Sequence, residues 1–519
     1  MDAPIISIPD TFNAAAEFVD RHVAEGRGQR IALRCRERAF TYQQVAEMVN
    51  RTGNALGSLG VEMENRVLLL LYDSPEFVAS FFGAIKIGAV PVPVNTMMRP
   101  ADYEYLLNDS RAKALIVQRE LWDQVAAVRH GLRYLKRVVI AGAPEPGLHY
   151  FTDWIAGASP ELEPAATCKD DAAFWLYSSG STGFPKGAVH LQHDMVYCAD
   201  LYAGPVLGIR PDDVVLSAAK LFFAYGLGNS LYFPFRAGAS SILFSGRPQP
   251  QTVFEIISRE RPTLFFGVPT LYASMLAMSE GERSYDLSSL RLCVSAGEPL
   301  PAELYRRWKN RFGIEILDGI GTTEVLHIFI SNRPGQVRAG SSGKVVPGYD
   351  VRIVTEQGVP AGPGEIGNLA VKGDSTCAFY WNQHEKTKQA MQGEWILTGD
   401  KYYRDEDDYY WYCGRSDDMM KVGGIWVSPI EVENTLIQHA AVLEAAVVGR
   451  DLNGLTKPEA FVVLKPGHTA DPGLEEELKH FVKDKIAPYK YPRKITFVPD
   501  LPKTATGKIQ RFKLRAMED

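Results

Sequence analysis

Apolar and polar residues alternate along the first 170 residues in short runs typical of strands and helices. Phe40–Leu59 begins with a threonine able to cap a helix, and its apolar residues recur at helical spacing. Val67–Leu71 and Ala89–Val94 are short apolar runs suited to buried parallel strands, and Pro75 opens a helical pattern between them. This strand–helix–strand repetition predicts a layered α/β domain with a parallel sheet.

The pattern changes in the last third of the chain. Glycines first separate short strand-like runs such as GEIGNLAVKG, which predicts a small β-rich subdomain. Further on, Ser428 and a following proline can cap a helix, and Ala445–Val448 and Ala460–Val463 are typical of strands. We therefore expect an α/β fold with two domains. Residues 1–416 form a large N-terminal domain of layered α/β subdomains plus the β-rich subdomain, and residues 417–519 form a small C-terminal α+β domain.

Composition excludes several classes of protein. The chain has 519 residues, a net charge of −6 and a pI near 6.0, so nothing favours a nucleic acid or an anionic membrane as partner. The most apolar tract, Val67–Val94, is interrupted by three charged residues and is not a simple membrane span. Six widely scattered cysteines without a CxxC pair favour reduced thiols in a cytoplasmic protein and argue against a cysteine metal site.

The stretch Leu176–His190, LYSSGSTGFPKGAVH, combines glycines, hydroxyl side chains and one lysine after an apolar strand-like run. Glycines allow close approach of the backbone to a ligand, and consecutive N–H groups beside hydroxyls form an anion-binding nest. Lys186 lies between proline and glycine, so the stretch is not a Walker A loop. A polar surface turn is the alternative interpretation, but phosphate binding explains the combination of residues better.

Three later stretches have the composition of binding or hinge segments. Asp318–Glu324, DGIGTTE, suggests a turn whose two glycines lie against a purine and whose acid can ligate Mg²⁺. Thr398–Asp400 suggests a turn whose carboxylate accepts hydrogen bonds from both ribose hydroxyls. Gly414–Gly424 contains glycines and acids typical of an exposed linker. For each stretch, an ordinary solvated turn is the alternative.

Together with the C-terminal string LPKTATGKIQR, these motifs resemble those of the adenylate-forming superfamily, which comprises acyl- and aryl-CoA ligases, luciferases and peptide-synthetase adenylation domains. The resemblance covers almost the whole chain. Around VLHIFISN the sequence is most similar to benzoate-CoA ligases.

The resemblance implies a role for individual residues. The implied catalytic residues are Lys508, Thr182, Lys186 and Glu324, with Glu324 also binding Mg²⁺. The implied nucleotide-binding residues are Ser178, Ser179, Gly180, Ser181, Gly183, Gly297, Glu298, Asp318, Gly319, Ile320, Gly321, Thr323, Asp400 and Arg415. Two of these depart from the family pattern, because Asp318 replaces an asparagine near the adenine amino group and Ile320 replaces a tyrosine that stacks on adenine.

The resemblance also implies an acyl pocket, a hinge and a CoA channel. The implied pocket residues are Phe223, Ala224, Tyr225, Gly226, His327 and Ile328, although the sequence without the resemblance favours ordinary core at these positions. Phe223 stands where many relatives have histidine. Asp417 is the implied hinge about which the C-terminal domain moves, and Gly424 is the implied lining of the CoA channel.

These features predict an ATP-dependent aryl-CoA ligase that joins benzoate to AMP and then to CoA, releasing diphosphate and AMP. ATP, Mg²⁺ and CoA are the expected cofactor and co-substrates, and a homodimer is a possible assembly. Alternatives are 4-hydroxybenzoate, another ring acid or a medium-chain acid as substrate. A nucleotide-binding protein without turnover is the alternative from another class.

Overall fold

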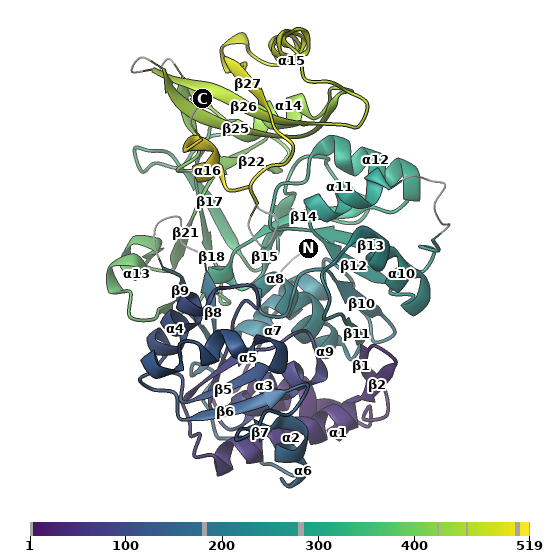
Figure 1. The fold of residues 1–519 in the computed structure, drawn as a ribbon, viewed down its shortest axis with the longest axis vertical. Helices are drawn as coiled ribbons and strands as arrows, with labels where there is room; N and C mark the ends of the chain where they lie inside the picture. The colour runs from purple at the N-terminus through teal and green to yellow at the C-terminus, as the bar shows by residue number, and fades with distance from the viewer. Residues whose placement is uncertain are drawn as a thin grey trace.

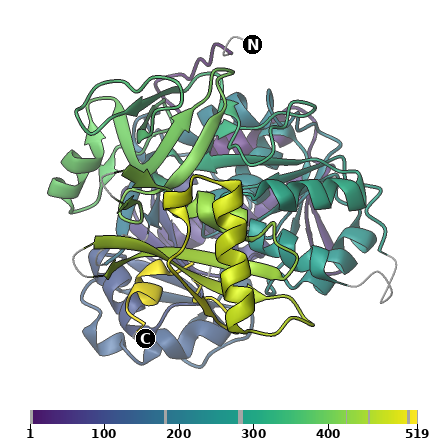
Figure 2. The same ribbon diagram turned by 90° about the horizontal axis from the view of Figure 1, so that it is seen from above.

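The computed structural model describes residues 4–178, 184–278, 285–422, 425–452, 455–503 and 509–517. Its elements form a large N-terminal domain and a small C-terminal domain, which lies above the larger one in Figure 1. Viewed from above, helix α15 (Pro472–Lys485) and the C-terminal strands lie over the middle of the larger domain (Figure 2). Within the described residues, no helix combines the length and apolar character needed to cross a bilayer.

The first layer is a five-stranded parallel sheet in the order β4-β3-β5-β6-β7. As expected, α2 begins at a capping box, in which Thr41 Oγ1 accepts from the Gln44 N–H at 3.2 Å and Gln44 Oε1 accepts from the Thr41 N–H at 2.9 Å. The elements are α1 (Arg21–Ala24), α2 (Tyr42–Ser58), β3 (Arg66–Leu70), α3 (Pro75–Lys86), β4 (Val90–Pro93), α4 (Pro100–Asp109), β5 (Ala114–Gln118), α5 (Arg119–Ala126), β6 (Arg137–Ala141), β7 (His149–Tyr150) and α6 (Phe151–Ala156).

The second layer is a nine-stranded sheet in the order β16-β15-β14-β13-β12-β10-β11-β1-β2. Its six central strands, from β14 to β1, are parallel, so their carboxyl ends share one edge. The elements are β1 (Ile31–Cys35), β2 (Arg38–Thr41), α7 (Asp194–Cys198), β10 (Val214–Ser217), α8 (Ala224–Leu227), α9 (Phe233–Ala237), β11 (Ser240–Leu243), α10 (Pro250–Glu260), β12 (Leu264–Gly267), α11 (Pro269–Ala277), β13 (Leu292–Ser295), α12 (Ala302–Phe312), β14 (Ile316–Gly321), β15 (Ile328–Ser331) and β16 (Lys344–Val345).

Two smaller antiparallel sheets complete the N-terminal domain. One pairs β8 (Ala172–Ser178) with β9 (Lys186–Leu191), and β9 with β19 (Phe379–Tyr380). The other is the expected β-rich subdomain, containing β17 (Asp350–Val354), β18 (Gly367–Lys372), β20 (Met391–Gln392), β21 (Trp395–Arg404) and β22 (Tyr410–Arg415). Helix α13 (His384–Ala390) follows β19.

The C-terminal domain contains β23 (Met420–Val422), β24 (Ile425–Val427), α14 (Pro429–Leu436), β25 (Val442–Leu452), β26 (Leu455–Leu464), α15, β27 (Lys494–Phe497) and α16 (Arg511–Arg515). Of these, α14, β25 and β26 lie where the sequence predicts a helix and two strands. Ser428 caps α14 by accepting from the Glu431 N–H at 3.2 Å, and its hydroxyl also donates to the Cys413 carbonyl at 2.5 Å. Cys413 belongs to β22, so this one side chain joins α14 to the β-rich subdomain.

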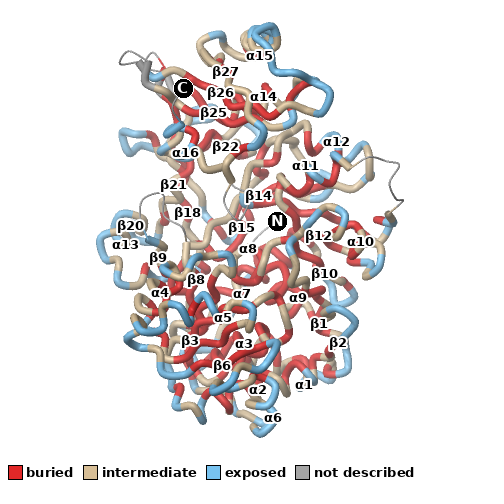
Figure 3. Tube along the Cα trace, in the orientation of Figure 1, coloured by how far each residue is buried: buried red, intermediate tan, exposed pale blue. Residues whose placement is uncertain are grey.

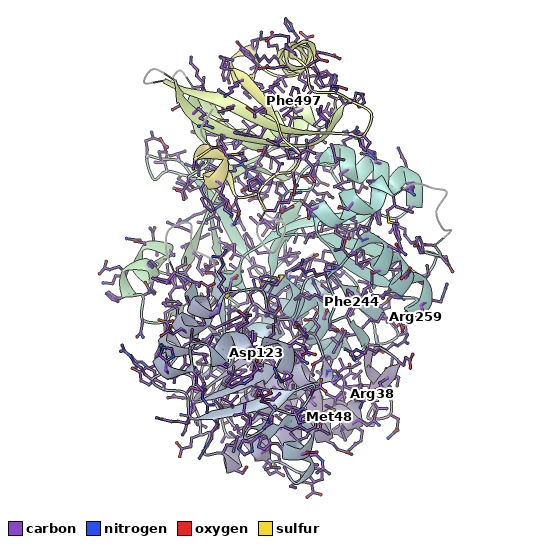
Figure 4. The ribbon with its side chains drawn as sticks, in the orientation of Figure 1. Arg38, Met48, Asp123, Phe244, Arg259 and Phe497 are labelled. Carbon is purple, nitrogen blue, oxygen red and sulfur yellow. The ribbon has the colours of Figure 1, made fainter. Side chains whose placement is uncertain are left out.

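The two domains have separate apolar cores. Met48 packs against the large core of the N-terminal domain and Phe497 against that of the C-terminal domain, at opposite ends of the molecule in Figure 4. The strands of the sheets are largely buried, whereas exposed residues lie on outer helices and loops (Figure 3). This arrangement leaves the carboxyl edge of the nine-stranded sheet facing the C-terminal domain (Figure 1).

Candidate active site

A cavity of about 710 Å³ lies between the two domains. The N-terminal domain lines it with the ends of β13 and β14, and the C-terminal domain with residues that include Glu433 and Arg511. All the predicted nucleotide-binding and catalytic residues that the structure describes line this one cavity: Ser178, Lys186, Gly297, Glu298, Asp318, Gly319, Ile320, Gly321, Thr323, Glu324, Asp400 and Arg415. Its volume is in the range of small-molecule and cofactor sites.

The other predicted residues lie outside the described part of the chain. They are Ser179, Gly180, Ser181, Thr182 and Gly183 of the phosphate loop, Gly424 of the implied CoA channel and Lys508. The described strands β8 and β9 flank the loop, since Ser178 ends β8 and Lys186 begins β9. The roles of these seven residues stay predictions.

The stretch DGIGTTE is not a turn, contrary to the sequence prediction. Asp318–Gly321 continues strand β14, in which Gly319 pairs with Ser331 and Ile320 with Ile330 of β15. A Cβ atom at Gly319 would lie 2.7 Å from the Ile330 carbonyl oxygen, so glycine is required by close packing of the two strands. The following residues, Thr323–Val325, form a single 3₁₀ turn that carries Glu324.

Asp400 also lies in a strand rather than in the predicted turn. Thr398–Asp400 belongs to β21, where a left-handed Gly399 with φ of 76° bends the strand. Asp400 pairs with Arg415 of β22, and Arg415 Nη1 donates to Asp400 Oδ1 at 3.0 Å. Sheet pairing thus brings together two predicted nucleotide-binding residues that lie 15 positions apart.

One corner of the cavity contains the residues expected to bind phosphate and metal. Ser178 Oγ donates to Glu324 Oε1 at 3.1 Å, and Tyr380 Oη donates to the same oxygen at 2.8 Å. Lys186 Nζ lies 4.2 Å from the centre of the Tyr380 ring. Burial lowers the pKa of Lys186, the Glu324 carboxylate opposes this effect, and the Lys386 ammonium adds to it.

Sequence reasoning missed Tyr380 and Lys386, both of which line the cavity. Tyr380 reaches the site because β19 pairs with β9, with Tyr380 opposite Ala188. Lys386 follows on α13. Their local sequence, FYWNQHEKT, contains no glycine-rich or other binding motif, and the long-range strand pairing that places them leaves no sequence signal.

The donor set at this corner fits a magnesium ion bound largely through substrate. Two hydroxyls occupy Oε1 of Glu324, and no described residue donates to its other carboxylate oxygen. Within the described ranges, no three His, Cys, Asp or Glu side chains come together as a metal-binding group. Mg²⁺ commonly takes one or two carboxylates and completes its shell with phosphate oxygens and water. Glu324 would hold such an ion, which would neutralise phosphate charge when bound.

Asp318 is buried in the cavity wall, at the position where the sequence resemblance implies an asparagine. It is 4% exposed, and its Oδ2 accepts a long hydrogen bond from the Leu300 N–H at 3.5 Å. Burial raises the pKa of Asp318 well above its usual value. A protonated carboxyl group carries one acceptor and one donor, as an amide does, so Asp318 can replace asparagine chemically.

The residues of the implied acyl pocket lie next to the cavity rather than among its lining residues. Ile328 lies directly behind β14, since a Cβ atom at Gly319 would be 2.9 Å from Ile328 Cγ2. His327 Nε2 lies 3.3 Å from the Tyr225 carbonyl oxygen. The structure therefore brings Tyr225, His327 and Ile328 together behind the strand that forms the cavity wall; the others, Phe223, Ala224 and Gly226, belong to or adjoin α8.

His327 is a neutral group in an aromatic shell. Its ring lies 4.4 Å from that of Phe233 and 5.5 Å from that of Tyr225, centroid to centroid. Burial lowers the pKa of His327 to about 3. Nε2 faces two acceptors, the Tyr225 carbonyl and, at 3.1 Å, Asn229 Oδ1, so Nε2 carries the proton. Nδ1 is therefore an acceptor, and it is buried without a partner among the described residues.

A buried carboxyl group supports the segment that leads to this pocket. Asp73, which is 3% exposed, accepts from the Leu221 N–H at 3.0 Å, and Lys220 Nζ lies 3.8 Å from its other oxygen. Burial raises the pKa of Asp73 to about 6, against the opposing effects of Lys220 and Leu221. Asp73 thus fixes the start of the loop that carries Phe223 and Ala224.

The cavity collects the residues predicted to bind a nucleotide, as expected of a nucleotide-dependent enzyme, and the chain belongs to the AMP-binding enzyme family. The family model named AMP-binding enzyme matches residues 20–381, and the model of the AMP-binding enzyme C-terminal domain matches residues 431–508. The resemblance seen in the sequence is thereby confirmed.

Individual relatives match over nearly the full length. A benzoate–CoA ligase of Thauera aromatica is 51% identical over 99% of this chain and 97% of its own. A 4-hydroxybenzoate–CoA/benzoate–CoA ligase of Rhodopseudomonas palustris is 48% identical over 98% of this chain and 94% of its own. The crystal structure of an anthranilate CoA ligase in complex with anthranoyl-AMP superposes with a TM-score of 0.95, at 47% identity and 98% coverage of both chains.

Proposed function

We propose that the chain is an AMP-forming aryl-CoA ligase that converts benzoate, ATP and CoA into benzoyl-CoA, AMP and diphosphate. One observation carries the proposal: the polar cavity containing Lys186, Glu324 and the Asp400–Arg415 pair is bounded by strand β14, next to which lies a buried aromatic cluster that includes Tyr225 and His327. Such a site can hold a nucleotide and a ring acid on the two faces of one strand.

The chemistry requires two steps. A carboxylate is a poor electrophile because it is negatively charged and its oxygen is a poor leaving group. Attack of the carboxylate on the α-phosphate of ATP makes a mixed anhydride with AMP and releases diphosphate. The CoA thiol then attacks the acyl carbon and AMP leaves. Because the first step brings negative charges together, positioning and cationic stabilisation supply most of the catalysis.

The proposed roles follow from these charges. Lys186 and the phosphate loop, with Thr182, would hold the phosphates, and Glu324 would hold a Mg²⁺ ion, which would neutralise phosphate charge when bound. Asp400 accepts from the ribose hydroxyls while Arg415 keeps its carboxylate in place at 3.0 Å. Lys508 stabilises the attacking carboxylate and the bridging oxygen during the first step.

The second step needs a route for the thiol, and we propose a movement of the C-terminal domain. The domains meet near Asp417, an exposed residue in the turn between β22 and β23. We propose boundaries of 1–416 and 417–519, with Asp417 as the pivot and Gly424 beside the CoA channel. A lysine-bearing domain that closes over the first step must move before a thiol can enter.

The residues around Tyr225 and His327 favour benzoate as the substrate and leave 4-hydroxybenzoate as the alternative. The Tyr225 hydroxyl already donates to the carbonyls of Gly267 and Val294, each at 3.3 Å. A para hydroxyl buried without a partner costs about 1–3 kcal/mol, roughly ten- to a hundredfold in kcat/KM. His327 Nδ1 could accept from such a hydroxyl, and the Rhodopseudomonas palustris relative is named for both acids, so 4-hydroxybenzoate is the second candidate.

A panel of acids tests the proposal. Benzoate, 4-hydroxybenzoate, 4-fluorobenzoate, cyclohexanecarboxylate and octanoate are compared for acid-dependent AMP and diphosphate release and for CoA thioester formation. We expect benzoate to give the highest kcat/KM and octanoate almost none. A higher kcat/KM for 4-hydroxybenzoate would replace benzoate but keep the reaction. Nucleotide binding without diphosphate release for any acid would support a binding protein without turnover.

Two features of the cellular context complete the proposal. The scattered cysteines support a cytoplasmic location, and four of the six are buried as thiols. A homodimer is proposed as the assembly, and size-exclusion chromatography with light scattering measures it directly.

A further inference from the structure

Tyr380 connects the two charged groups at the phosphate corner of the cavity. Its hydroxyl donates to Glu324 Oε1 at 2.8 Å, and its ring lies under Lys186 Nζ at 4.2 Å. The residue is 4% exposed, so both contacts are shielded from solvent. The strand pair β9–β19 fixes its backbone, because Tyr380 lies opposite Ala188, two residues beyond Lys186.

The hydroxyl contact determines which way the Glu324 carboxylate points. Tyr380 and Ser178 both donate to Oε1, at 2.8 and 3.1 Å, and the second oxygen receives no hydrogen bond from a described residue. Hydrogen bonds to one oxygen of a ligating carboxylate orient the other oxygen, and such supporting partners tune metal affinity.

The ring contact acts on the lysine. An ammonium over the face of a tyrosine ring is attracted by its quadrupole, more strongly where water is excluded. Lys186 is bonded to no carboxylate within 4.0 Å among the described residues, so the ring is the contact that locates its ammonium. The hydroxyl and the ring of one side chain therefore act on different partners.

We infer that Tyr380 is a positioning residue of the proposed adenylation step: its hydroxyl aims Glu324 at the divalent cation and its ring aims Lys186 at the phosphates. The inference rests on the proposed function. A purely structural role is the alternative, because Tyr380 also packs in the core and its N–H donates to Thr387 Oγ1 at 3.1 Å.

Two substitutions separate hydroxyl from ring, and one controls for lost stability. Tyr380→Phe removes the hydroxyl alone, whereas Tyr380→Leu removes the ring as well. Tyr42→Phe removes another buried tyrosine hydroxyl, which donates to the Ala239 carbonyl over 2.7 Å. Tyr42 does not line the cavity. Mn²⁺ binding to each protein with a nonhydrolysable ATP analogue is measured by electron paramagnetic resonance, alongside the Mg²⁺ dependence of adenylation.

We expect Tyr380→Phe to weaken Mn²⁺ binding and raise the KM for Mg²⁺ by about ten- to a hundredfold, since it removes a hydrogen bond to a charged group. The KM for the acid and thioester formation from supplied acyl-adenylate should stay at wild-type values. Tyr380→Leu should in addition weaken metal-independent binding of the analogue severalfold. Tyr42→Phe should leave both Mn²⁺ binding and the Mg²⁺ dependence unchanged.

Wild-type Mn²⁺ binding by Tyr380→Phe would overturn the inference, as would equal losses in both half-reactions. Equal behaviour of the Phe and Leu variants would remove the role of the ring. The Mn²⁺ measurement needs no acid and no turnover. If every acid failed as a substrate while Tyr380→Phe still weakened Mn²⁺ binding, the proposed function would fall and the positioning role would stand.

Discussion

The regions on the two sides of strand β14 differ in charge. On the cavity face, Glu324 and Lys186 sit among hydroxyls and other charges, and each is placed by specific hydrogen-bond or ring contacts. On the face behind it, His327 lies neutral in an aromatic shell, with its pKa lowered to about 3. On the proposed function, charge would select the phosphates, whereas shape and the absence of charge would select the acid.

The largest effect should come from removing the charge proposed to act on the cavity side. Lys508→Ala should reduce adenylation by two or more orders of magnitude and largely spare thioester formation from supplied acyl-adenylate. Single-turnover assays of the two half-reactions measure both rates. Lys513→Ala, a change at an exposed lysine of α16, is the matched control. Equal loss in both half-reactions would contradict the assignment of Lys508.

A smaller effect should follow from replacing Lys386, a lysine that lines the cavity. Lys386→Gln should weaken ATP binding by about five- to tenfold and AMP binding much less, because the extra phosphates carry the charge that an ammonium attracts. Calorimetric titration with each nucleotide gives the two affinities. Lys388→Gln on the same helix changes an exposed lysine that does not line the cavity. If ATP binding and AMP binding were weakened equally, Lys386 would not interact with the β- and γ-phosphates.

A third effect is on stability rather than on activity, and it concerns Asp73, which supports the segment leading to the His327 side of the molecule. The pKa of Asp73 is higher in the folded protein, at about 6, than in the unfolded chain. Its contribution to the free energy of unfolding is therefore fully present below about pH 4 and is lost as pH rises through 6. A shift from 3.8 to about 6 corresponds to about 3 kcal/mol at neutral pH. Asp73→Asn should therefore gain stability relative to wild type as pH rises from about 4.5 to 7.5, measured by thermal unfolding.

Asp213 gives the control of opposite sign. Burial raises the pKa of Asp213, but hydrogen bonds from Arg291 and Thr263 outweigh this effect and lower the pKa below its usual value. Its stabilising contribution is present above pH 4 and is lost as pH falls, so Asp213→Asn should lose stability relative to wild type as pH rises. The same pH trend in both variants would show that the two buried carboxyl groups are not distinguished as described.

The sequence predicted elements best where local signals were complete. Helix α2 follows from its capping threonine and apolar spacing, and α14 from Ser428 and Pro429. The sequence-based prediction failed where a glycine is required by tertiary packing or by strand geometry rather than by a turn. Gly319 and Gly399 suggested turns, yet one allows close packing of β14 on β15 and the other bends β21. A glycine in a short motif does not reveal which of these causes requires it.

The site followed the same division. Residues within motifs, such as Lys186 and Glu324, were expected at the cavity, and the structure places them there. Tyr380 and Lys386 were missed because β19 pairs with a strand almost 200 positions earlier. Strand pairing over such a sequence separation depends on the whole fold, so no local sequence pattern predicts it.

Ser428 has a consequence for the timing of the proposed two-step reaction. Its hydroxyl caps α14 and also donates to the Cys413 carbonyl, in the strand that precedes Asp417. A rotation about Asp417 would exchange this hydrogen bond for one with water, at a net cost of about 1 kcal/mol. That difference alone biases the resting population about fivefold toward the arrangement described here. If Asp417 is the pivot as proposed, Ser428 would therefore reduce the fraction of molecules in which the domain has rotated before the thiol arrives.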